Sequence, residues 1–220
     1  PDGGRIVHLE GEGEPFELIE RHGRVPLPPY VERPPDPEDR ERYQTVYADA
    51  IGSVAAPTAG LHFTTELLQA AAAMSVAIAR VTLHVGPGTF RPVDVEDPRE
   101  HVLHSERWEM TPATAQHLNA ARSSGGKIWA VGTTSARVLE TTVRHDGRFK
   151  PGTGWTDLYI LPPHDFHGID ALVTNFHLPR SSLLMLISAF AGTELVMRAY
   201  RHAVQQEYRF YSYGDAMLIL

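Results

Sequence analysis

Short segments rich in β-branched residues alternate with helix-length segments from Ser53 to the end of the chain, and this alternation limits the fold more than any other feature. Strands are expected at 53–56, 76–85, 127–131, 157–161 and 171–174. Helices are expected at 65–74, 112–124, 133–143, 182–191 and 194–206. Strands that alternate with helices of this length indicate an α/β domain with a layered, largely parallel sheet and flanking helices.

A cluster of prolines separates this region from the first part of the chain: Pro26, Pro28, Pro29, Pro34, Pro35 and Pro37. Because proline fixes φ and has no N–H donor, the cluster predicts an extended connector, after which Asp36 caps a helix. Before the connector, Arg5–Leu9 alternates like a strand, and Phe16–Arg21 suits a short helix or a strand end. We therefore expect two parts, residues 1–25 and residues 26–220.

The composition excludes several classes of protein. The 220 residues include no cysteine, which rules out a disulfide framework, a thiolate zinc site and a cysteine nucleophile, and fits a reducing compartment. The longest apolar run, Leu183 to Ala191, is far shorter than the ~20 residues that span a bilayer. The N-terminus has neither a methionine nor a signal-like apolar stretch. We expect a soluble, cytoplasmic protein that makes no membrane contact, and a chain that starts partway into a longer gene product.

The net charge of −7 argues against a nucleic-acid partner, but its distribution matters. Residues 1–50 hold 12 acidic and 6 basic residues, whereas residues 51–220 hold 15 acidic and 14 basic residues. The balanced part has enough arginines for a basic groove, or these arginines are scattered over a solvated surface: Arg80, Arg91, Arg137, Arg180, Arg198, Arg201 and Arg209. Composition alone does not decide between these possibilities.

Four loops at expected strand ends are rich in small and polar residues: 55–63, 83–90, 131–137 and 174–179. Ligands of open α/β sheets bind beyond the carboxyl ends of the strands, so these loops are the candidate site. In the third loop, Gly132 lets a ligand approach the backbone, and the following helix start offers free N–H groups to an anion. Simple capping of that helix by a threonine or serine is the structural alternative.

Two other patterns are weaker indications of a binding site. Gly86-Pro87-Gly88 resembles the start of a dinucleotide fingerprint, but the third glycine is absent. The group His101, His104 and Glu106 lacks a third histidine or a cysteine at zinc-site spacing, so no metal site is predicted. Glu106 or a nearby histidine fits general acid–base chemistry better. The alternative for His84 is a core histidine at a strand end.

Together these segments resemble one family, the S-adenosylmethionine:tRNA ribosyltransferase-isomerases of queuosine biosynthesis. The resemblance runs in order from residue 22 to the end and rests on HGRVPLPPYVERP (22–34), ERYQTVYA (41–48), VAAPTAGLHF (54–63), VTLHVGPGTFRPV (81–93), HSE (104–106), AVGTTSARVLE (130–140), GWTDLYILPP (154–163), DALVTNFHLPRSSLLMLISAFAG (170–192) and YRFYSYGDAML (208–218). Departures are Ala136 in place of a more usual valine and Pro163-His164 in place of a glycine–aromatic pair. Family members also carry a long further N-terminal portion with most of an inserted β-barrel, so residues 1–25 are expected to be the remnant of that barrel.

The resemblance implies transfer of the ribosyl part of S-adenosylmethionine (SAM) to the aminomethyl group of 7-aminomethyl-7-deazaguanine at the tRNA wobble position. Adenine and methionine leave, and the sugar rearranges to give epoxyqueuosine. SAM is then a co-substrate, no other cofactor is expected, and the enzyme is expected to act as a monomer. Such chemistry requires a base, an acid for the departing adenine and polar groups around the ribose.

Residues of the strand-end loops are candidates for these roles. His84 and Glu106 are the predicted proton-transfer residues, and the 132–135 turn is predicted to hold the methionine carboxylate or the ribose. The predicted substrate-binding residues are Thr58, His62, Gly86, Gly88, Gly132, Thr133, Thr134, Ser135, Arg137, Asp157, Asn175, His177 and Asp215. Two alternatives stay open: a truncated relative that binds tRNA without turnover, and a nucleotide-binding α/β enzyme that acts on a small molecule.

Overall fold

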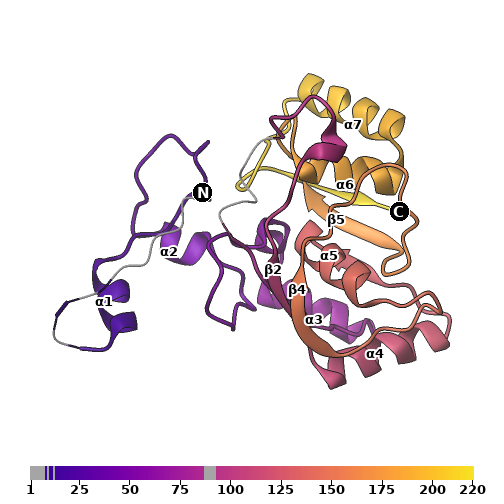
Figure 1. The fold of residues 1–220 in the computed structure, drawn as a ribbon, viewed down its shortest axis with the longest axis horizontal. Helices are drawn as coiled ribbons and strands as arrows, with labels where there is room; N and C mark the ends of the chain where they lie inside the picture. The colour runs from indigo at the N-terminus through magenta and orange to yellow at the C-terminus, as the bar shows by residue number, and fades with distance from the viewer. Residues whose placement is uncertain (1–7, 9, 12, 87–92) are drawn as a thin grey trace.

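The computed structural model describes residues 8, 10, 11, 13–86 and 93–220 (Figure 1). The helical elements are α1 (Pro15–His22), α2 (Asp39–Arg42), η1 (Thr58–His62), α3 (Thr65–Ala73), η3 (Pro98–Glu100), α4 (Pro112–Ser123), α5 (Thr133–Thr142), α6 (Ser182–Ala191) and α7 (Thr193–Gln205). The strands are β1 (Thr82–His84), β2 (Glu106–Met110), β3 (Trp129–Val131), β4 (Gly152–Thr156), β5 (Ala171–Asn175) and β6 (Ala216–Ile219).

The strands form two small sheets instead of one. The first has the order β1-β2-β4 and is antiparallel throughout. The second has the order β3-β5-β6, in which β3 and β5 are parallel and β5 and β6 are antiparallel. The α/β class is therefore confirmed, but the prediction of a largely parallel sheet is wrong. The prediction assumed that a helix between two strands returns the chain to the same sheet. Here β3 and β4, on either side of α5, belong to different sheets, so the alternation of strands and helices does not produce a parallel sheet.

The helices after residue 60 agree with the sequence. Thr64 and Thr111 accept hydrogen bonds from the backbone N–H groups of Leu67 and Thr114, and so cap α3 and α4 as predicted. Helices α5, α6 and α7 lie within a residue or two of their expected bounds. Near the connector, Asp36 accepts from the Asp39 N–H, but the helix itself starts at Asp39.

The strands agree less well. Those at 127–131 and 171–174 are confirmed as β3 and β5, and only Thr82–His84 of the 76–85 segment is a strand. Segments 53–56 and 157–161 contain no strand, and β2, β4 and β6 lie where none was expected. Strand β4 contains two glycines, which are rare in strands. One of them is required by packing, because a Cβ on Gly154 would lie 3.0 Å from the Trp108 ring.

Helix α5 lies between the two sheets and connects them into one core. It packs against β1 and β2 of the first sheet and against β3 and β5 of the second. Its Ala136 and Val138 are fully buried, as are Leu172 of β5 and Ile187 of α6. This packing fixes the position of the N-terminal end of α5, which is where the candidate site lies.

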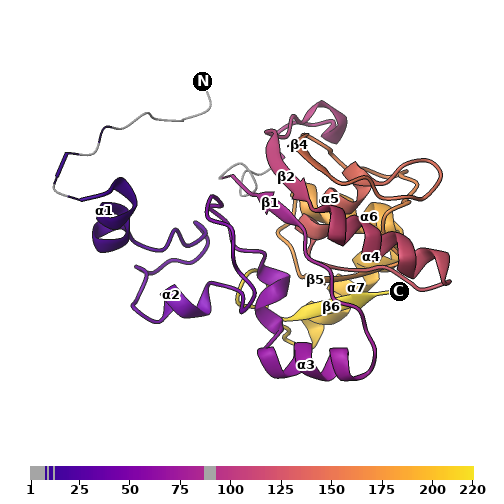
Figure 2. The ribbon, with the colours of Figure 1, turned by 90° about the horizontal axis from the view of Figure 1, so that it is seen from below.

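The first part of the chain lies to one side of this core, as both views show (Figures 1 and 2). Helix α1 buries none of its residues and is linked to α2 by an ion pair between Glu20 and Arg40. The segment 16–21 is thus a helix, whereas the strand expected at 5–9 falls almost entirely outside the described residues. The described part of residues 1–25 contains no strand and gives no support for a barrel remnant, and the division at residue 25 stays a prediction.

No single helix of the described ranges is long and apolar enough to cross a membrane. Helices α6 and α7 reach that length and composition only as a pair, with a bend of 116° between them.

Candidate functional site

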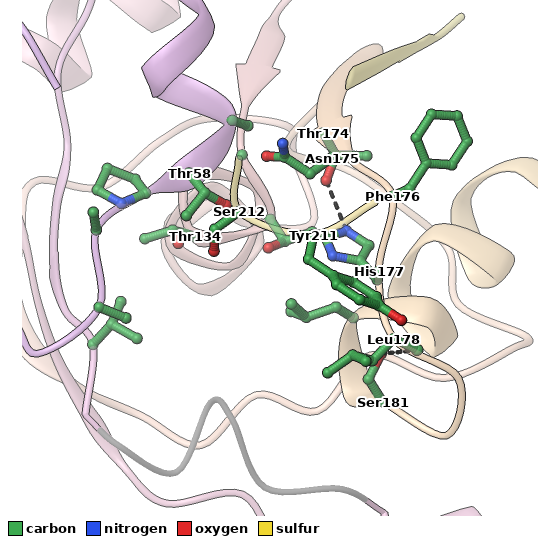
Figure 3. Close-up of a pocket in the computed structure, with 18 of the residues that line it drawn as sticks. Thr58, Thr134, Thr174, Asn175, Phe176, His177, Leu178, Ser181, Tyr211 and Ser212 are labelled. Atoms are coloured by element: carbon green, nitrogen blue, oxygen red, sulfur yellow. Dashed lines mark hydrogen bonds between the residues drawn. The ribbon is translucent and has the colours of Figure 1, made fainter. Parts of the chain in front are cut away.

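The carboxyl ends of β3 and β5 meet at one edge of the second sheet. Because these two strands are parallel and in register, with Val131 opposite Val173, the loops that follow them leave the sheet side by side. The segment leading into η1 approaches from the other side. A cavity of about 200 Å³ lies between them (Figure 3). It is lined by Tyr30, Ala55, Ala56, Pro57, Thr58, Ala59, Val85, Gly132, Thr133, Thr134, Thr174, Asn175, Phe176, His177, Leu178, Pro179, Arg180, Ser181, Leu183, Tyr211 and Ser212.

The N-terminal end of α5 opens into this cavity. Gly132 has φ +89°, a left-handed conformation that favours glycine, and its N–H donates to the Val173 carbonyl at 2.8 Å. The first N–H to bond within the helix is that of Ala136, which donates to the Gly132 carbonyl at 3.1 Å. The N–H groups of residues 133–135 therefore have no partner within the helix, and no side chain caps it. This end of α5 presents partial positive charge and hydrogen-bond donors to the cavity.

A buried polar network lies at the end of β5. The Oγ1 of Thr174 is 2.8 Å from Nε2 of His177, whose backbone N–H donates to the Tyr200 hydroxyl at 2.8 Å. Burial lowers the pKa of His177 to about 4 and raises the pKa of Tyr200 to about 12. Both groups are therefore neutral at pH 7 and act through hydrogen bonds.

Asn175 joins this network to η1. Its Nδ2 lies 3.1 Å from Nε2 of His62, while its buried Oδ1 has no hydrogen-bond partner among the described residues. A buried amide oxygen without a partner is costly, so a ligand that supplies a donor would stabilise this site.

The opposite wall comes from segments far apart in the sequence. Tyr30 belongs to the proline-rich connector, and Tyr211 and Ser212 belong to the loop after α7. The Tyr30 hydroxyl lies 2.5 Å from the Ser212 hydroxyl, and the rings of Tyr30 and Tyr211 lie 4.9 Å apart. Only Arg180 among the described lining residues carries a formal charge at neutral pH, and none of them is acidic.

The structure brings together about half of the predicted site. Six of the predicted residues line the cavity: Thr58, Gly132, Thr133, Thr134, Asn175 and His177. His62 adjoins it through Asn175. Seven described residues are not among the lining: His84, Gly86, Glu106, Ser135, Arg137, Asp157 and Asp215. Gly88 lies outside the described residues.

The two predicted proton-transfer residues lie on opposite faces of the first sheet. His84 is directly opposite Arg107, so these side chains share a face, and Glu106 precedes Arg107 on the same strand. Glu106 is buried, pairs with Arg137, and accepts a hydrogen bond from the Gly86 N–H at 3.3 Å. The buried Nδ1 of His84 has no partner within the described part of the chain. The pair is not arranged to act on one atom from the same side of the sheet.

The two predicted aspartates have other environments. Asp157 is exposed just after β4. Asp215 accepts from the Arg209 N–H at 2.7 Å, and its own N–H donates to the Arg209 carbonyl at 2.8 Å. Asp215 therefore closes the loop that carries Tyr211.

The arginines do not gather around the cavity. Arg137 is occupied by Glu106 and by the Leu158 carbonyl, and Arg201 and Arg209 are exposed but outside the lining. Arg91 is outside the described residues. Within the described ranges, no group of three or more histidine, aspartate or glutamate residues is placed to hold a metal ion.

Sequence reasoning missed Tyr30 and Ser212. Residues 26–37 were expected to be a connector only, and no local pattern indicates that Tyr30 contacts Ser212, 182 residues later in the chain. Tyr211 lies in the 208–218 segment that carries the resemblance, but it is not among the predicted site residues.

Comparisons with known proteins agree with the resemblance. The chain matches the family model described as "Queuosine biosynthesis protein" over residues 1–219. It is 59% identical over 218 residues to the S-adenosylmethionine:tRNA ribosyltransferase-isomerase of Symbiobacterium thermophilum, which covers 99% of this chain and 63% of that protein. The enzyme of the same name from Moorella thermoacetica is 57% identical over 222 residues, which covers 100% of this chain and 64% of that protein.

A solved structure is also similar. It is the S-adenosylmethionine tRNA ribosyltransferase from Thermotoga maritima, with 48% identity and a TM-score of 0.62, and the match covers 74% of this chain and 51% of that one. The chain thus spans less than two thirds of the length of the curated relatives it matches.

Proposed function

The chain belongs to the queuosine biosynthesis protein family, and from this premise we propose that it transfers and isomerises the ribosyl moiety of SAM onto 7-aminomethyl-7-deazaguanine in tRNA. The observation that carries the proposal is the identity of 57–59% with two S-adenosylmethionine:tRNA ribosyltransferase-isomerases over essentially the whole chain. In this proposal the products are epoxyqueuosine-tRNA, adenine and methionine, and the enzyme works in the cytoplasm as a monomer.

The cavity is compatible with the SAM side of this reaction. It combines hydroxyl groups from Thr58, Thr134 and Ser212 with the donors at the start of α5, and these can hold the ribose as it opens. Thr133, Asn175 and His177 are proposed to bind substrate with them. The neutral state of His177 at pH 7 makes it a hydrogen-bonding group and not a source of charge.

The proton-transfer roles of His84 and Glu106 are part of the proposal. A base must remove a proton beside the sulfonium or from the aminomethyl ammonium, and an acid must protonate the leaving adenine. Because the two side chains point to opposite faces and neither lines the cavity, we propose that at most one of them takes part in proton transfer, at a part of the substrate that lies beyond the cavity. His84, with its unpartnered Nδ1, is the better candidate. Glu106 then serves mainly to neutralise Arg137.

The test is adenine release, measured by liquid chromatography with mass detection. The reaction contains this chain, SAM and tRNA that bears 7-aminomethyl-7-deazaguanine. We expect release that requires the modified tRNA, with a matching gain in nucleoside mass. Release without tRNA would indicate a small-molecule hydrolase. Binding of tRNA without release would mean that these 220 residues bind tRNA but do not complete the reaction alone.

Variants at the two candidates separate chemistry from folding. His84→Ala is expected to reduce turnover by about 10²-fold or more. Glu106→Ala leaves the buried Arg137 guanidinium unpaired and is expected to lower the free energy of unfolding by about 3–5 kcal/mol. Each variant is therefore assayed below its melting temperature, and Glu109→Gln, exposed on the same strand, is the control. A His84→Ala variant with near-normal turnover would remove His84 from the mechanism.

A further inference from the structure

Two tyrosines give the cavity an aromatic wall that no catalytic role above uses. Both Tyr30 and Tyr211 line it, with their ring planes at 47° to each other. Figure 3 shows Tyr211 beside His177, with its hydroxyl directed toward Leu178. The wall exists only in the folded chain, because its two rings come from segments that the fold brings together.

The loop at residues 209–215, here the tyrosine loop, holds Tyr211 in an unusual conformation. Tyr211 has φ +73°, which is uncommon for a residue other than glycine, and strained residues of this kind cluster at active sites and ligand clamps. Its N–H donates to the Phe176 carbonyl at 3.0 Å, and its carbonyl accepts from the Gly214 N–H at 3.1 Å. Gly214 is itself confined, since a Cβ there would lie 2.5 Å from the Arg209 and Phe210 carbonyl oxygens. These backbone contacts fix the part of the loop that carries the Tyr211 ring.

The charge of the lining indicates which part of SAM it would receive. SAM has a charged half, with sulfonium, ammonium and carboxylate groups, and a neutral half, the adenosine. No described lining residue is acidic, so neither the sulfonium nor the ammonium group has a counter-charge in the cavity. Arg180, the one charged residue of the described lining, is exposed, so a carboxylate outside the cavity can reach it. The adenosine half is a neutral heteroaromatic ring with hydroxyl groups and needs no counter-charge. Its hydrogen-bond donors suit the unpartnered Oδ1 of Asn175.

The size of the cavity also indicates that it receives only part of SAM. Pockets that enclose a whole drug-sized ligand measure roughly 300–1,000 Å³. This cavity measures about 200 Å³ and therefore encloses only part of SAM.

We propose that the cavity binds the adenosine half of SAM, with the adenine ring stacked on Tyr211 and the methionine half outside. The identity of the nucleoside rests on the function proposed above, whereas the preference for a neutral aromatic ligand rests on the lining itself. Stacking of a base on an aromatic side chain accounts for much of the affinity of such sites, so loss of the ring is expected to weaken binding by about tenfold or more.

The experiment is a calorimetric titration of this chain with adenosine, SAM and L-methionine, each used separately. We expect adenosine and SAM to bind and methionine to bind far more weakly. Tyr211→Phe keeps the ring and is expected to bind like the wild type, whereas Tyr211→Leu is expected to lose about tenfold or more for both adenosine and SAM. Tyr208→Leu is the control, because Tyr208 is exposed and not part of the lining.

A second measurement uses only the wild-type chain, so it does not depend on the folding of a variant. In the adenosine complex, nuclear Overhauser effects are expected between the Tyr211 ring protons and H2 or H8 of adenine. Their absence, methionine binding as tightly as adenosine, or no binding of adenosine would each overturn the assignment. Adenine release with tRNA tests the proposed reaction independently, since either result can hold without the other.

Discussion

His177 shows how a buried histidine can take part in a polar network without carrying charge. Its ring is enclosed at the end of β5, and burial alone lowers its pKa to about 4. Protonation would place a cation beside the Thr174 hydroxyl with no carboxylate among the residues described around the cavity. The neutral imidazole instead fixes the turn from β5 into the 176–181 loop.

This burial predicts a pH dependence of stability. The unfolded chain takes up a proton near pH 6.5 and the folded chain only near pH 4, so the unfolded state binds more protons between these values. The free energy of unfolding is therefore expected to fall as the pH falls from 6.5 to 4, with His177 contributing up to about 3 kcal/mol. In urea denaturation, His177→Gln is expected to show a shallower pH slope, and His202→Gln, on the exposed face of α7, the wild-type slope. Equal slopes for wild type and His177→Gln would contradict this account.

Single residues could be predicted where their position follows from the chain itself. Thr134 and Asn175 were identified because they lie at the ends of recognisable strands, and the parallel β3–β5 pair brings these strand ends together. Thr58 also lines the cavity, although the strand expected before it at 53–56 is absent. The relation between His84 and Glu106 could not be predicted in this way. It depends on the β1–β2 register, and β2 was not recognised as a strand.

A cluster around Asp39 connects the first part of the chain to the tyrosine loop. Asp39 is 2% exposed, accepts two hydrogen bonds from Arg33 at 2.6 and 2.7 Å, and accepts a third from the Tyr213 hydroxyl at 2.8 Å. The Arg33 guanidinium holds the pKa of the Asp39 carboxyl well below its usual range. We call Arg33, Asp39 and Tyr213 the Asp39 clasp. The clasp holds Tyr213 of the tyrosine loop, whereas the Phe176 carbonyl holds the Tyr211 N–H.

The clasp is expected to affect ligand binding without touching the ligand. Asp39→Asn removes the charge that holds Arg33 and weakens the acceptor for Tyr213, so the tyrosine loop loses part of its preorganisation. Adenosine affinity is expected to fall by about three- to tenfold, since ordering the loop then becomes part of the cost of binding. Calorimetry checks the affinity, with Glu38→Gln, which neighbours Asp39 outside the clasp, as the control. Unchanged adenosine binding by Asp39→Asn would show that the clasp does not position the loop.

At the level of elements, helices were predictable and strand pairing was not. Thr64, Thr111 and the apolar periodicity define helix ends locally, through caps and contacts within a few residues. Strands such as β4 and β6 are specified by their partners, since β4 pairs with β2 and β6 completes the sheet beside β5. The pairing of these strands depends on tertiary packing, so it could not be predicted from the local sequence.

For the proposed tRNA substrate, the distribution of charge along the chain limits the possible binding surfaces. Residues 1–50 carry most of the net negative charge and would repel a polyanion, whereas residues 51–220 are nearly balanced. Arg180 is the one formally charged residue in the described lining, and it is exposed at the cavity. A tRNA that brings its wobble base to the opening of this cavity would place a backbone phosphate close to Arg180.

Arg180→Gln is therefore expected to weaken tRNA binding while adenosine binding stays close to that of the wild type. Because Arg180 already has φ +54°, glutamine bears the same backbone strain, and the variant tests the charge alone. If the guanidinium binds a phosphate, the slope of log affinity against log salt concentration falls in magnitude by about one. Filter binding or fluorescence anisotropy over a series of salt concentrations measures this slope. Arg148→Gln, exposed in the turn before Phe149, is the matched control and is expected to keep the wild-type slope. If Arg180→Gln and Arg148→Gln gave the same slope, tRNA would have to approach the cavity without using Arg180.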